Sequence, residues 1–132
     1  MNKLETLGLA AAWIAYWKAP EDSAEREALF WASEREWELV RKAPHDAWQV
    51  IVAILDKDDS IEIQEVLSAG PLEDLLAYHG ESMISAVEAE AIKNPRFASL
   101  LGGVWQNNTK EEVWARVQAV WDRRGWDGEP EA

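Results

Sequence analysis

The sequence predicts an all-α fold of about seven to eight helices, either a helical bundle or a short HEAT-like α-solenoid. Two observations carry this prediction. Apolar residues recur at intervals of three and four along most of the chain, which is the spacing of one face of an α-helix. Prolines and glycines interrupt this pattern repeatedly, at points where helices are expected to end and restart. Because no linker-like stretch divides the chain, we expect a single helical domain over residues 1–132.

The first 43 residues are expected to form an N-terminal pair of helices. The first helix covers residues 3–18, and the apolar positions expected to face the core are Leu4, Leu7, Ala11, Ile14 and Trp17. Pro20 ends this pattern, and a second helix is expected from about residue 22 to residue 42. Its apolar stripe includes Trp37, whereas Trp31 points away from that stripe.

Residues 44–125 are expected to form the rest of the helical core, followed by a tail over residues 126–132. A deeply buried helix is predicted at about 46–56, because its residues are apolar nearly all round. A strand remains the alternative there, since the run is rich in β-branched side chains.

The centre of the chain predicts a short helix between two stops. Gly70 suits the left-handed position that ends one helix, and Pro71 suits the first turn of the next. Gly80 is expected to close this short helix. Further along, Thr109 and Glu112 have the spacing of a capping box for the last helix.

The net charge of −12 is unevenly distributed. Residues 44–92 hold 11 acidic side chains and one basic side chain, Lys57. Such a surface argues against direct binding to nucleic acid or to an anionic membrane, both of which need basic side chains. It favours a basic protein partner, although acidity that serves only solubility is an equal alternative.

A candidate partner-binding surface follows from this charge. Its residues are Asp56, Asp58, Asp59, Glu62 and Glu65, with Trp31 as an apolar anchor. Nine tryptophans are more than a chain of 132 residues usually contains. Most are expected in the core, but tryptophan is also enriched among the residues that dominate protein interfaces.

The sequence contains no recognisable catalytic constellation. It has no cysteine, two histidines, no phosphate-binding loop and no zinc-protease motif. Glu73, Asp74 and His79 form the one group that could support acid–base chemistry, although a histidine at a helix end is the simpler interpretation. We therefore expect no enzyme, no cofactor and no metal site.

The cellular location is expected to be cytoplasmic. The N-terminal region has no signal-peptide pattern, and no apolar run approaches the ~20 residues that a membrane-spanning helix needs.

Five motifs carry a resemblance to a known family. They are GPLEDLL at residues 70–76, HG at 79–80, NPRF at 94–97, LLGGVW at 100–105 and VWARV at 113–117. Over roughly residues 46–121 the chain resembles a family of small uncharacterised all-helical bacterial proteins, a domain of unknown function. The resemblance implies an all-helical fold and no particular activity, and the first forty residues look less typical of the family.

Small acidic proteins of this class resemble the immunity partners of bacterial toxins. By that analogy we expect an immunity-type protein that neutralises a basic toxin or other effector by occluding it. Two alternatives remain: a phage-type inhibitor or nucleic-acid mimic that binds a basic protein, and an enzyme centred on His79.

Overall fold

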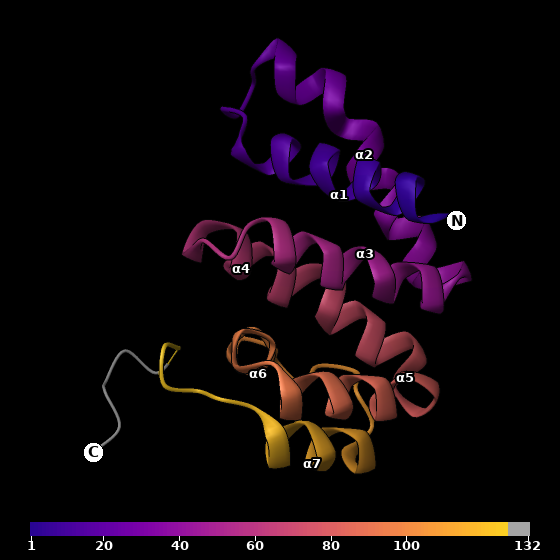
Figure 1. Ribbon diagram of the computed structural model, residues 1–132, viewed down its shortest axis with the longest axis vertical. Helices are drawn as coiled ribbons and strands as arrows, with labels where there is room; N and C mark the ends of the chain where they lie inside the picture. Colours follow the sequence, from indigo (N-terminus) through magenta and orange to yellow (C-terminus); the bar gives the residue numbers. More distant parts are fainter. Residues whose placement is uncertain (127–132) are drawn as a thin grey trace. The chain divides into compact units, whose positions relative to one another are not determined.

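The computed structural model describes residues 1–126, which contain helices and no strands, so the all-α prediction is confirmed (Figure 1). Contacts divide the chain into two compact units. Unit 1 covers Met1–Ile63, and unit 2 begins at Gln64. The two units are described separately below. None of the helices in the described residues is long and apolar enough to cross a membrane.

Unit 1 is built from three helices that all contact one another: α1 (Lys3–Lys18), α2 (Ala24–Lys42) and α3 (Pro44–Lys57). The α3 segment is helical, so the strand alternative is wrong. Because α3 packs on both α1 and α2, the division falls after Ile63 and not after residue 43. The expectation of a single domain over the whole chain stays a prediction.

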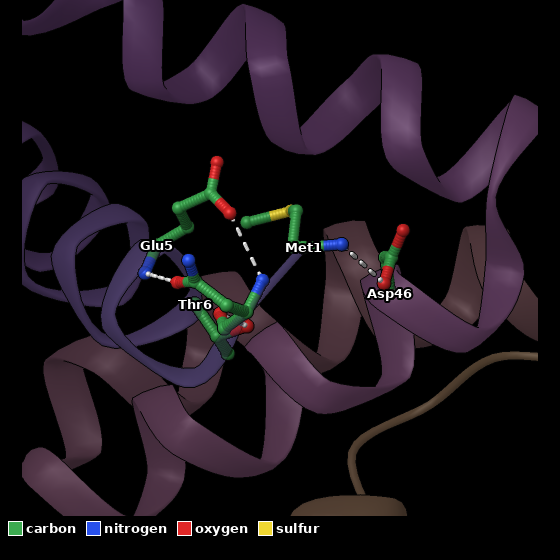
Figure 2. Close-up of polar contacts among 5 residues, drawn as sticks. Met1, Glu5, Thr6 and Asp46 are labelled. Atoms are coloured by element: carbon green, nitrogen blue, oxygen red, sulfur yellow. Dashed lines mark hydrogen bonds and ion pairs between the residues drawn. The ribbon is translucent and has the colours of Figure 1, made fainter.

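The N-terminus of α1 is fixed by a reciprocal cap. The Asn2 side chain accepts from the backbone N–H of Glu5 at 2.8 Å, and the Glu5 carboxylate accepts from the backbone N–H of Asn2 at 2.9 Å. Figure 2 shows this turn together with the Met1 amino group, which lies 3.4 Å from the Asp46 carboxylate in the first turn of α3. The starts of α1 and α3 therefore lie side by side.

The core face of α1 differs from the predicted one. Its buried residues are Leu9, Ala10 and Trp13, while Leu4 is 80% exposed. On α2 the buried residues include Ala32 and Leu39, and Trp37 is 53% exposed. Both helices carry apolar residues outside their buried face. The spacing of apolar residues along the chain therefore does not identify which face is buried.

The predicted stop at Gly70 and Pro71 is wrong. Helix α4 (Ile61–Leu67) continues through one π-helical turn, η1 (Ser68–Leu72), directly into α5 (Glu73–Lys93). The backbone N–H of Glu73 bonds to the carbonyl of Ser68, five residues earlier, which gives the wide π turn. A wide turn accommodates Pro71, whose ring would clash with the preceding turn of a regular α-helix. The described chain thus has six continuous helical runs, slightly below the predicted seven to eight helices.

Helix α5 bends at His79, whose φ of −136° and ψ of 27° are not helical. The predicted break near Gly80 is therefore present as a kink, and the helix resumes after it. A Cβ added at Gly80 would lie 3.0 Å from a methyl group of Val113 in α7 (Glu111–Val120). The glycine thus permits a close approach of α5 and α7, as glycines do where elements meet closely.

Helix α6 (Pro95–Leu101) begins at Asn94, whose side chain caps the N–H of Arg96 at 3.1 Å. Helix α7 has Lys110 at its N-cap and no side-chain cap bond, so the predicted Thr109 capping box is wrong. The Thr109 side chain is instead buried. After α7 the chain returns to α6, where the Trp126 indole donates to the Ser99 carbonyl at 2.6 Å. The rest of the predicted tail lies outside the described residues.

Candidate functional site: the acidic end of unit 1

One ion pair joins two acidic segments that are far apart in the sequence. The Lys18 ammonium, in the last turn of α1, lies 2.5 Å from the Asp58 carboxylate, which directly follows α3. Together with the Met1–Asp46 contact at the other end, this pair shows that α1 and α3 run in the same direction (Figure 1).

The ion pair places the last turn of α1 beside the turn after α3. Glu21 and Asp22 follow Lys18 by three and four residues, a distance of at most about 14 Å along the backbone. Asp56, Asp59 and Glu62 flank Asp58 in the same way. We call this group the acidic end. Its members are Glu21, Asp22, Asp56, Asp58, Asp59 and Glu62.

Asp58 is a structural member of the acidic end. Its carboxylate also accepts from the backbone N–H of Ser60 at 3.0 Å, and Ser60 in turn caps the N–H of Ile63 at 3.4 Å. The bond from Lys18 is the main reason why the pKa of the Asp58 carboxyl is lowered, and the same bond raises the pKa of Lys18. Asp58 therefore serves the turn before α4, and its charge is already compensated.

The other acids of the group are open to solvent. Asp56, Asp59 and Glu62 are exposed, as are Glu21 and Asp22. Asp22 has a φ of 61°, in the left-handed region that aspartate tolerates better than most residues. The Arg26 guanidinium lines a hollow with Glu21 and Asp22 and lies over the rings of Tyr16 and Trp17, 4.9 Å from each ring centroid.

Asp58→Asn tests the structural role of this carboxylate. The variant loses the charge pair, and we expect the free energy of unfolding to fall by about 0.5–1 kcal/mol at pH 7, since the pair is partly solvated. Glu62→Gln, with the same charge change at an exposed neighbour, should cost less. Urea unfolding followed by circular dichroism would measure both values, and equal losses would contradict the role assigned to Asp58.

The same variant gives a pH signature. Because the folded-state pKa of Asp58 lies below the ordinary value of 3.8, its contribution to stability is present above about pH 4. The contribution is lost as the pH falls through the lowered pKa. The difference in stability between wild type and Asp58→Asn should therefore shrink on acidification.

Trp31, which the sequence placed off the apolar stripe of its helix, is exposed. The side chain is 52% exposed on α2, in unit 1, and it lines a hollow with Phe30 and Trp37, which are exposed to similar degrees. Glu65, by contrast, belongs to unit 2, where it is exposed on α4.

The group formed by Glu73, Asp74 and His79 lies in unit 2. Glu73 accepts from the backbone N–H of Trp105 at 3.0 Å and from the Asn107 side chain at 2.7 Å, so it anchors the loop before α7. His79 lines a separate small hollow at the α5 kink with Tyr78 and Lys110. These two bonds give Glu73 a structural role that the sequence pattern did not indicate.

Metal-ligand geometry is not found in the described part of the chain. No group of three or more His, Asp or Glu side chains there could hold a metal ion.

Several residues of this region were not singled out from the sequence. They are Lys18, Glu21 and Asp22 at the acidic end, and Phe30 beside Trp31. The pairing of Lys18 with Asp58 spans 40 residues and has no local signal. Glu21 and Asp22 precede α2, where acidic side chains also suit the positive end of the helix dipole.

The fold and this surface define an acidic, all-helical class of small domain with exposed aromatic residues. Residues 19–125 match the sequence pattern of the family of unknown function DUF6869, and the chain belongs to that family. The match confirms the resemblance and extends it to α2, so the Trp31 region lies within the family's span. The chain has no significant match among curated proteins, and none among solved structures.

Proposed function

We propose that this chain is a protein-binding domain whose acidic end holds a basic partner. Its role would be that of an immunity-type protein, which neutralises a bacterial toxin by covering it. The observation that supports this most strongly is the Lys18–Asp58 ion pair, which brings the end of α1, three residues before Glu21, beside the acidic turn after α3. Exposed carboxylates on such a surface speed association with a cationic partner and favour it over neutral ones.

The exposed aromatic side chains of α2 support the same proposal. Interfaces need an apolar centre as well as complementary charge, and tryptophan is enriched among the residues that dominate binding. Unit 1 presents Trp31 and Phe30 on the helix that begins next to Glu21 and Asp22. A partner that contacts the acidic end could therefore also bury an aromatic ring.

The test is capture of a partner from the native host with the tagged protein, at low and at moderate salt, read by mass spectrometry. We expect one stoichiometric basic protein, held less tightly as salt rises. Co-expression should then relieve the toxicity of that protein. Capture of no basic protein would overturn the proposal, whereas a partner displaced by DNA would favour the nucleic-acid mimic.

Charge variants locate the surface. Asp59→Asn combined with Glu62→Gln should weaken binding to the captured partner about tenfold and reduce its salt dependence. Glu111→Gln combined with Glu112→Gln is the matched control, since it removes two exposed charges from α7 in unit 2. If both double variants bind alike, the acidic end is not the binding surface. Asp58 is left intact in this design because of its bond to Lys18.

A further inference from the structure

Trp31 lies between two glutamates on one side of α2. Glu27 precedes it by four residues and Glu34 follows it by three, so both project within about 40–60° of Trp31 around the helix axis, on the same side. Residues at these spacings have neighbouring side chains on a helix surface. All three side chains are exposed. The result is an aromatic ring with two carboxylates beside it.

The described residues of the chain use none of these three side chains internally. No ring, cation or ion-pair contact involves Trp31, Glu27 or Glu34 in that part of the structure. The neighbouring base Arg35 projects on the opposite side of Trp31 and lies 3.5 Å from Glu38, with which it pairs. The exposed ring and its two acids therefore remain available to a cation from outside.

Elsewhere the chain places arginine on its aromatic rings. The Arg41 guanidinium lies 3.5 Å from the ring centroid of Trp37, the Arg26 guanidinium lies over Tyr16 and Trp17, and Arg123 lies over Trp121 at 5.1 Å. A guanidinium is planar, stacks on an indole and can bond a carboxylate with two N–H groups at once. Lysine offers a point charge without this geometry.

We propose that Trp31, Glu27 and Glu34 form a docking site for an arginine side chain of a basic protein partner. The guanidinium stacks on the Trp31 indole and pairs with one of the two carboxylates. This inference deepens the proposed function and rests on it for the identity of the partner. The site's preference for arginine over lysine follows from the ring and carboxylates alone, so it can be tested without that partner.

The first experiment uses two peptides of ten residues with blocked ends, one alternating arginine with alanine and the other alternating lysine with alanine. Each is titrated into the full chain labelled with ¹⁵N. The indole N–H signal of Trp31, assigned through Trp31→Phe, should move further and saturate earlier with the arginine peptide. The indole signal of Trp37, a ring that Arg41 already covers, should move less. Equal responses of Trp31 to both peptides would overturn the proposal.

Paired variants then separate the site from general charge. Glu27→Gln with Glu34→Gln should weaken binding of the arginine peptide by about fivefold to tenfold. Glu111→Gln with Glu112→Gln removes the same charge from α7 in unit 2 and should change the affinity by less than about twofold. Similar losses of affinity in both double variants would show that net charge alone explains the weaker binding. This result would refute the site.

The captured partner gives an outcome that separates the two proposals. Trp31→Ala should weaken its binding at least about tenfold. If charge variants at the acidic end lose the partner while Trp31→Ala binds it normally, the proposed function stands and the arginine site is refuted. If the peptide titrations succeed but no basic partner is captured, the arginine chemistry stands and the immunity role fails.

Discussion

Trp13→Ala should lower the free energy of unfolding by about 3–5 kcal/mol, the usual cost of truncating a large buried aromatic side chain. Trp13 is 1% exposed and is the largest fully buried side chain of α1. Its ring lies 6.1 Å from the ring of Trp17, measured between centroids, so the loss removes an aromatic contact as well as buried area. The three helices of unit 1 would be left with a cavity at their centre.

Leu4→Ala is the matched control for this prediction. The sequence pattern placed Leu4 in the core, but the side chain is 80% exposed, so we expect a change within about 0.5 kcal/mol. Urea unfolding of both variants measures the difference. A loss at Leu4 equal to that at Trp13 would contradict the orientation of α1. Trp13→Phe, which keeps most of the buried area, provides a measurable value if the alanine variant does not fold.

Gly102→Ala should destabilise unit 2 by about 3 kcal/mol, at the upper end of the usual cost of overpacking. A Cβ at this position would lie 2.0 Å from the backbone oxygen of Asp122, far inside any permitted contact. The segment after α7 cannot easily retreat. The Asp122 N–H donates to the Ala98 carbonyl at 2.9 Å, and Arg123 donates to the Gly102 carbonyl at 2.7 Å.

Gly70→Ala separates this steric effect from the general effect of replacing glycine. Gly70 lies in the η1 turn, has no left-handed φ, and leaves open space around an added Cβ. Alanine there should be neutral or should stabilise the chain by up to about 1 kcal/mol, because it restricts the unfolded state. The comparison fails if both substitutions destabilise equally.

The NMR signal of the Trp126 indole N–H reports which part of the chain the Gly102→Ala substitution disturbs. The Trp126 indole donates to the Ser99 carbonyl at 2.6 Å, and the same ring lies 2.6 Å from the Cβ position of Gly103. Displacement of the segment from α6 should therefore shift the indole N–H signal of Trp126. The corresponding signal of Trp13, in unit 1, should remain unchanged.

The properties that depend on local sequence were predicted well. Apolar spacing, prolines and capping residues are read within a few positions, so α1, α2 and α3 were located to within about two residues. The motifs around GPLEDLL and LLGGVW sufficed for the family. The sequence placed Trp31 off the apolar stripe of α2, and its side chain is 52% exposed.

The tertiary structure decided which faces meet and which charges pair. Helix α1 is apolar on several sides, so only its contacts with α2 and α3 select Trp13 over Leu4. The π turn at Gly70 and Pro71 depends on a backbone hydrogen bond between residues five positions apart, Glu73 and Ser68. The sequence has no simple signal for such a bond. Lys18 and Asp58 are 40 residues apart, and Glu73 bonds Trp105 across 32 residues. The sequence by itself determined the three helices of unit 1, the family and the excess of acid. Only folding brought the acidic segments together, because side-chain pairing over such separations follows from helix packing and not from spacing along the chain.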